Sequence, residues 1–88
     1  MVKTYTNYEF NNVIIDSTIE VEAHSVTFMN TGEVNLTINA ELTLTPGDEI
    51  TFGGRLESKV KQSFVIVFEE SLLITNLLII VENSYKEL

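Results

Sequence analysis

The chain is dominated by segments in which apolar and polar residues alternate with a period of two. Clear examples are the run from Val34 to Ile38 and the run from Leu42 to Leu44. Such alternation is typical of strands with one buried face, and the Thr, Val, Ile and Phe in these segments suit a pleated surface. Because no comparable stretch shows a helical stripe, the pattern predicts an all-β fold.

The alternation, together with Gly and Asn residues that are typical of turns, predicts nine strands. They cover residues 3–9, 12–16, 19–23, 25–30, 34–39, 41–45, 48–53, 60–69 and 72–83. Short segments with regularly spaced turns are typical of β-sandwiches and jelly rolls. We therefore predict one small antiparallel β-sandwich or jelly-roll-like domain of eight or nine short strands over residues 1–88. Residues 1–10 are expected to form an N-terminal arm or an edge strand.

Three turn signals separate these segments. The stretch Asn30–Glu33 (NTGE) is expected to form a hairpin turn between two alternating runs. In the stretch Thr45–Asp48 (TPGD), proline followed by glycine predicts a type II turn, because glycine accepts the positive φ required there. Gly53 and Gly54 are expected to form a sharp corner rather than a phosphate-binding loop, since acidic residues precede them and no helix follows.

The last third of the chain contains strands that are apolar on both faces. A two-sheet sandwich covers only the inner faces, so the outer residues are expected to contact either the N-terminal segment or another subunit. Tyr5 and Tyr8 lie in that N-terminal segment, together with Phe10, and an extended arm there can add a strand to a neighbouring subunit. The predicted interface residues are Tyr5, Tyr8, Val65, Val67, Leu78 and Ile80.

Candidate catalytic chemistry is sparse. His24 is the only histidine, and its neighbour Ser25 is expected to point to the opposite face of a strand. Adjacent acidic pairs are abundant, but pairs at turns more often serve solubility than acid–base catalysis. Calcium binding through Asp48 and Glu49 lacks the spacing of an EF-hand loop. We therefore predict a non-enzymatic protein with no cofactor and no metal.

Composition narrows the choice of partners. The 88 residues include 13 acidic and five basic side chains, for a formal charge of −8, which disfavours binding to nucleic acid or to anionic membranes. The longest apolar stretch, from Leu72 to Val81, is about half the length of a membrane-spanning helix, and the N-terminus lacks the apolar region of a secretory signal. The absence of cysteine fits folding in a reducing cytoplasm.

The chain resembles a small β module that recurs in the virions of tailed phages. In that module a hairpin of the form N-x-G precedes x-L-x-P-G-x-x-x-x-F-G-G, and a closing pair I-x-F … N-x-L-x-I-I ends in a tyrosine. The matching positions are Asn30, Gly32, Leu44, Pro46, Gly47, Phe52, Gly53, Gly54, Ile66, Phe68, Asn76, Leu78, Ile80 and Tyr85.

This resemblance implies a non-enzymatic structural protein of a phage virion, made in the host cytoplasm. It would be a small decoration, connector or fibre-associated subunit of the capsid or tail. Its expected partners are further copies of itself, as a homo-oligomer, and other virion proteins. The alternative is an accessory adhesion or binding domain of a bacterial cell-surface protein, because similar turns occur in bacterial immunoglobulin-like surface repeats.

Overall fold

The computed structural model describes residues 3–55 and 58–87, and this part of the chain contains eight strands and no helix. The strands are β1 (Lys3–Val13), β2 (Ser17–Ala23), β3 (Ser25–Asn30), β4 (Leu36–Ile38), β5 (Leu42–Leu44), β6 (Glu49–Gly53), β7 (Val60–Phe68) and β8 (Leu77–Glu87). The predicted all-β fold is therefore confirmed.

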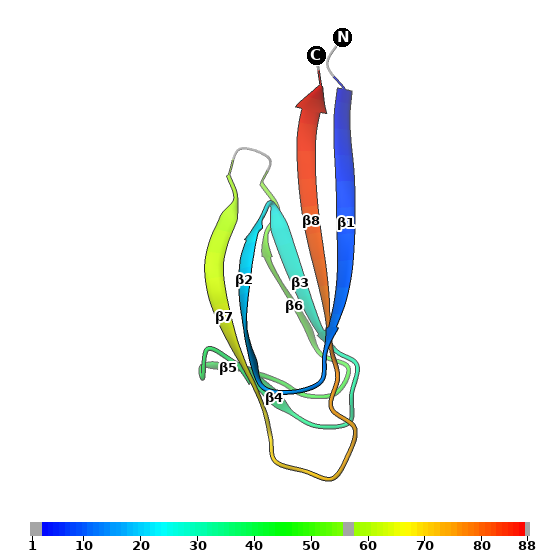
Figure 1. The fold of residues 1–88 in the computed structure, drawn as a ribbon, viewed down its shortest axis with the longest axis vertical. Coiled ribbons are helices and arrows are strands. Elements are labelled where there is room, and N and C mark those ends of the chain that lie inside the picture. The colour runs from blue at the N-terminus through cyan, green and yellow to red at the C-terminus, as the bar shows by residue number, and fades with distance from the viewer. Residues whose placement is uncertain (1–2, 56–57, 88) are drawn as a thin grey trace.

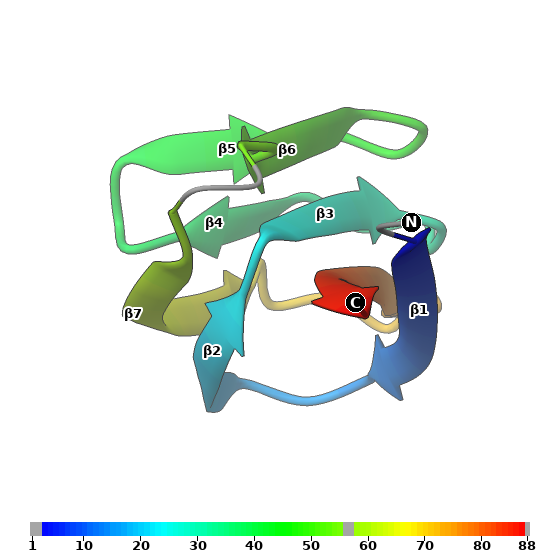
Figure 2. The same ribbon diagram turned by 90° about the horizontal axis from the view of Figure 1, so that it is seen from above.

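The strands form two four-stranded antiparallel sheets that pack together as a sandwich (Figures 1 and 2). The first sheet has the order β1-β8-β3-β6, and the second has the order β2-β7-β4-β5. Strand β1 pairs with β8, β2 with β7, β3 with β6 and β4 with β5. A long hairpin rolled up on itself produces these pairings, so the predicted sandwich has jelly-roll topology.

The core lies between the sheets because each strand turns its apolar phase inward. It consists of Val21, Ala23, Val26, Phe28, Leu36, Ile38, Leu44, Phe64, Ile66, Phe68, Leu77 and Ile79. Phe28 of the first sheet and Phe64 of the second are fully buried, and their ring centroids are 4.9 Å apart. Phe52 on β6 packs against both rings, at 6.0 and 5.2 Å. These tilted and edge-on contacts stabilise the sandwich where the sheets meet.

The segment Asn30–Glu33 does not form the predicted hairpin turn; it carries the chain from the first sheet to the second. Its backbone donors bind a distant loop instead of a hairpin partner: Gly32 N–H reaches Asn76 O at 3.1 Å, and Glu33 N–H reaches Ile74 O at 2.7 Å. A Cβ on Gly32 would meet Asn76 N at 2.5 Å, so only glycine permits this close approach. The hairpin prediction is wrong because these long-range bonds replace the local one.

The side chain of Asn30 organises this crossover from the inside. It is only 1% exposed, and its Nδ2 donates to the carbonyl oxygens of Val34 at 2.8 Å and Leu44 at 2.9 Å. Its Oδ1 accepts from Gly32 N–H at 3.1 Å, and its backbone N–H donates to Asp48 O at 2.9 Å. The Asn30 amide therefore forms hydrogen bonds with backbone groups of the crossover and of β5. Because it is buried, these groups depend on the amide rather than on water for their hydrogen bonds.

The other two turn predictions are confirmed. Asp48 N–H donates to Thr45 O at 2.9 Å, and Gly47 has a φ of 91°, as a type II turn requires. Gly53 and Gly54 both have positive φ and form the corner after β6.

The turn between β4 and β5 contains two residues in the left-handed region, Asn39 (φ 54°) and Ala40 (φ 57°). Asn39 is held there by β7, because its backbone N–H donates to Val65 O and its Oδ1 accepts from Val65 N–H, both at 2.8 Å. Ala40 is exposed and has no such support from a side-chain hydrogen bond.

Several predicted strand ranges need correction. Strand β1 runs without a break from Lys3 to Val13, so the predicted ranges 3–9 and 12–16 are not separate strands, and the predicted range 34–39 shortens to Leu36–Ile38. Residues 14–16 form the β1–β2 loop rather than the end of a strand over 12–16, and residues 72–76 lie in the β7–β8 loop rather than in a strand over 72–83. Side chains of both loops form hydrogen bonds with backbone groups: Asp16 Oδ1 accepts from Phe68 N–H at 2.8 Å, and Thr75 Oγ1 donates to Ile14 O at 2.6 Å. Apolar sequence alone did not reveal that these residues are loops.

Strands β1 and β8 extend beyond the sandwich as a two-stranded ribbon. Strand β3 pairs with β8 only from Leu77 to Glu82, whereas β1 continues to pair with β8 as far as Glu87. The ribbon gives the molecule its length of 54 Å against 19 and 17 Å in the other directions, and it brings both ends of the chain together (Figure 1). The predicted N-terminal segment is thus an edge strand of the first sheet.

We expect the isosteric substitution Asn30→Asp to lower the free energy of unfolding by roughly 2–4 kcal/mol, because carboxylate oxygens would face the carbonyls of Val34 and Leu44 without a donor. Urea denaturation at neutral pH measures this change. Asn12→Asp is the matched control, since Asn12 is exposed and uses its side-chain oxygen to accept from Asn76 Nδ2. Equal losses in the two variants would contradict a special role for the Asn30 amide.

We expect Ala40→Gly to stabilise the protein by about 1 kcal/mol, because glycine removes the steric cost of a left-handed φ at an exposed position. The midpoint of thermal unfolding should rise. Ala23→Gly provides the contrast: Ala23 is buried in β2, so the same change there should lower the midpoint. A fall in the midpoint for Ala40→Gly would show that this turn is not strained.

Candidate protein-binding surfaces

The structure separates the four outer residues predicted from β7 and β8. Val65 and Val67 lie on the outer face of the second sheet, whereas Leu78 and Ile80 lie on the outer face of the first. The inward residues Phe64, Ile66 and Phe68 of β7 and Leu77 and Ile79 of β8 are buried, which confirms the alternation on which the prediction depended. The four residues therefore belong to opposite sides of the sandwich and do not form one surface.

The first sheet carries an apolar surface on its outer face, which we call the β1–β8 patch. Its members are Tyr8, Phe10, Met29, Leu78 and Ile80. Phe10 lies directly opposite Ile80 in the β1–β8 register, and Met29 lies opposite Leu78 in the β3–β8 register. Tyr8 and Phe10 are 56% and 62% exposed, although aromatic side chains of this size are normally largely buried. The N-terminal segment thus widens the apolar face instead of covering it.

Tyr5 does not belong to this patch. It stands on the opposite face of β1 from Tyr8, because three residues separate the two along a strand of period two. Its Cα partner on β8 is Tyr85, in the ribbon beyond the sandwich.

Val65 and Val67 are less well placed for an apolar contact. Their neighbours across the strands are Thr18 and Thr37, and Thr37 Oγ1 donates to Val67 O at 3.5 Å. Each valine is a little over 40% exposed. Isolated valines among threonines are ordinary on the outer face of a sheet.

A second apolar surface was missed by sequence reasoning, and we call it the distal tip. It consists of Ile14 and Ile15 in the β1–β2 loop and Leu72, Leu73 and Ile74 in the β7–β8 loop, each between 57% and 106% exposed. Both loops lie at the end of the molecule opposite the chain termini (Figure 1). The available signal is the presence of five aliphatic residues next to short polar stretches, and this pattern fits a strand as well as a loop.

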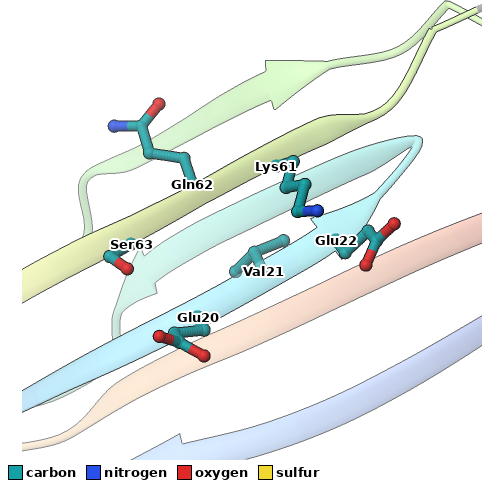
Figure 3. Close-up of a pocket in the computed structure, with 6 residues that line it drawn as sticks. All are labelled: Glu20, Val21, Glu22, Lys61, Gln62 and Ser63. Atoms are coloured by element: carbon teal, nitrogen blue, oxygen red, sulfur yellow. The ribbon is translucent and has the colours of Figure 1, made fainter.

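A shallow groove lies over β2 and β7, and its side chains are shown in Figure 3. It is lined by Glu20, Val21, Glu22, Lys61, Gln62 and Ser63. Ser63 faces Glu20 across the two strands, and Lys61 faces Glu22. The groove therefore brings a hydroxyl, an amine and two carboxylates to one surface, but it places no histidine beside the hydroxyl to act as a base.

His24 lies at the junction of β2 and β3 and is buried. Its Nδ1 accepts from the backbone N–H of Ser84 at 2.9 Å, so the basic nitrogen on that side is already occupied. Ser25 turns the other way and donates to Glu82 Oε2 at 3.3 Å. The histidine thus stabilises the sheet as a backbone acceptor, and the adjacent serine is not its partner.

Asp48 is bound within its own turn. Its Oδ2 accepts from Thr45 Oγ1 at 2.6 Å and from Thr45 N–H at 2.9 Å. These hydrogen bonds, first that of the hydroxyl and then that of the backbone, lower the pKa of the Asp48 carboxyl below its ordinary value of 3.8. Among the residues of the described ranges, no three acidic or histidine side chains are grouped so as to hold a metal ion.

No protein-family model matches the chain, and no curated protein is detectably similar to it in sequence. In the described part of the chain, no helix is long and apolar enough to span a membrane.

The lowered pKa of Asp48 predicts a specific pH dependence. The carboxylate stabilises the folded state at pH values above its unfolded pKa of 3.8, and this contribution is lost as the pH falls through the lower folded pKa. The unfolding midpoints of the wild type and Asp48→Asn should therefore differ most near neutral pH and converge in acid. Parallel curves of unfolding midpoint against pH for the wild type and Asp48→Asn would contradict the prediction.

Proposed function

We propose that this chain is a non-enzymatic structural subunit of a bacteriophage virion, which self-associates through the β1–β8 patch and also contacts other virion proteins. The observation that carries the proposal is the pair of exposed aromatic side chains, Tyr8 and Phe10, beside Leu78 and Ile80 on one face of the first sheet. An apolar face of this kind favours association, because an isolated subunit would leave it in contact with water.

The composition of the patch suits a protein interface. Tyrosine, phenylalanine and methionine are enriched in interface cores, whereas charged residues are depleted there. In the cross-strand row through Phe10, Ile80 and Thr27, the side chains are uncharged, while Glu82 and Glu49 lie in the two flanking rows. The centre of the patch is therefore uncharged, as the core of a protein interface usually is, and its acidic residues lie in the neighbouring rows.

Two copies of the chain can associate symmetrically through the β1–β8 patch. If two copies stack these faces about a twofold axis, each Phe10 enters the patch of the other copy, and the same residues are buried twice. Because β1, β8 and β3 are already hydrogen-bonded in one sheet, their backbone needs little further ordering on binding, which lowers the cost of association.

Assignment to a virion is supported by the resemblance to tailed-phage modules and by the jelly-roll topology, which is common in viral capsid proteins. Lectins also use this topology, so fold alone does not decide the function. A virion part repeated by symmetry needs a surface that contacts other copies, and the β1–β8 patch is a candidate for it. We place the mature protein in the virion, after synthesis in the host cytoplasm.

The test is light scattering after size exclusion, over a range of micromolar concentrations. We expect the wild type to elute as a fixed multiple of the 9.9 kDa chain, and Tyr8→Thr with Phe10→Thr to weaken association by about tenfold or more. Threonine preserves strand propensity, so far-ultraviolet circular dichroism should not change.

The matched control is Val65→Thr with Val67→Thr on the opposite sheet, which should leave the oligomer intact. A strictly monomeric wild type, or equal dissociation of the two variants, would contradict self-association through the β1–β8 patch. A monomer would favour the alternative of a surface-protein binding domain.

A further inference from the structure

The distal tip is an apolar surface held in a fixed shape. Thr75 Oγ1 donates to Ile14 O at 2.6 Å and so joins the β1–β2 loop to the β7–β8 loop. The β7–β8 loop is also bound to the crossover, because Glu33 N–H donates to Ile74 O at 2.7 Å. Leu73 N–H is satisfied by Ser71 Oγ at 3.0 Å. Because these bonds hold the backbone, the exposed aliphatic side chains are presented without the ordering cost that a mobile loop would incur on binding.

A set of exposed carboxylates borders the tip. Asp16 follows Ile15 directly, and Glu69 and Glu70 precede the β7–β8 loop. Glu33, Glu69 and Glu70 line one surface depression together with Leu73, which places these acidic groups beside the apolar ones.

The basic residues of the chain lie elsewhere. Lys3 and Lys86 are at the far ends of β1 and β8, and Arg55, Lys59 and Lys61 are at the end of β6 and the start of β7. Figure 1 shows these strand ends pointing away from the β7–β8 loop. The tip is therefore apolar at its centre and acidic at its border.

The charge distribution around the distal tip favours one kind of binding partner over the others. Two tips facing each other would bring two sets of like charges together, which disfavours a symmetric contact between copies. An anionic lipid surface would repel the same carboxylates, and the tip lacks the Trp and Tyr that favour a membrane interface. A protein segment that presents apolar side chains together with Lys or Arg satisfies both the aliphatic side chains and the carboxylates.

From this combination we infer that the distal tip is a docking site for a protein segment that combines apolar side chains with Lys or Arg. The aliphatic residues supply the contact area, and the acidic border orients the partner and gives the binding a dependence on ionic strength. The tip lies at the end of the long axis, whereas the β1–β8 patch lies on a side of the sandwich, so the two surfaces act independently.

A random-sequence peptide library displayed on mRNA provides the probe. It is selected for binding to the wild-type protein and counter-selected against Leu72→Ser, Leu73→Ser and Ile74→Ser combined in one chain. We expect the enriched peptides to combine apolar residues with Lys or Arg. The triple variant should lose at least about tenfold in affinity for them. Glu69→Gln with Glu70→Gln should weaken binding several-fold and reduce its salt dependence.

Two controls separate this inference from its alternatives. Tyr8→Thr with Phe10→Thr should bind the selected peptides as the wild type does, whatever its oligomeric state. The triple variant should keep the wild-type circular dichroism spectrum and unfold at a similar temperature, because its replaced side chains are exposed. Failure to enrich any peptide that discriminates the triple variant would overturn the inference. Binding to phosphatidylcholine vesicles by the wild type, lost in the triple variant, would also overturn it by assigning the tip to lipid.

Discussion

The buried amide of Asn30 is the interaction on which the arrangement of the two sheets depends. It lies where the chain leaves β3, and its side chain donates to carbonyls of the crossover and of β5 while its backbone bonds to the β5–β6 turn. A buried carbonyl that lacks a donor is costly, so the two bonds of this amide favour the observed path of the chain between the sheets. Hydrophobic burial supplies most of the stability, but burial alone is not directional and would tolerate other crossovers.

The path of the chain between the two sheets determines which sheet each strand joins, and therefore on which side of the molecule its outward residues lie. Strand β7 belongs to the second sheet and β8 to the first, so their outward residues diverge although both strands are apolar on both faces. Pairing with β1 then adds Tyr8 and Phe10 to the side that already holds Ile80. The apolar outer residues of β1, β3 and β8 therefore gather on the first sheet, and the proposed interface follows from the topology rather than from any single strand.

Sequence reasoning succeeded where the signal is local and failed where it is not. Period-two alternation placed Phe64 and Ile79 in the core, and the Pro46–Gly47 turn follows from the dihedral preferences of two residues. The segment Asn30–Glu33 has the composition of a hairpin turn, yet its hydrogen-bond partners come from a loop some forty residues later. The distal tip was missed because Leu72 to Ile74 fit a strand as well as a loop when only their apolar character is considered.

The positions of the two apolar surfaces bear on how such a subunit could be built into a larger assembly. The β1–β8 patch lies on a broad side of the elongated molecule, and the distal tip lies at one end of its 54 Å axis. Because the surfaces do not overlap, lateral contacts between copies would leave every tip free to bind a different protein. Several tips held at fixed spacing would then bind together, and their joint affinity would exceed that of one tip by the effective-concentration effect. A weak end contact can thus suffice for attachment, provided that the lateral contacts hold the copies in a fixed arrangement.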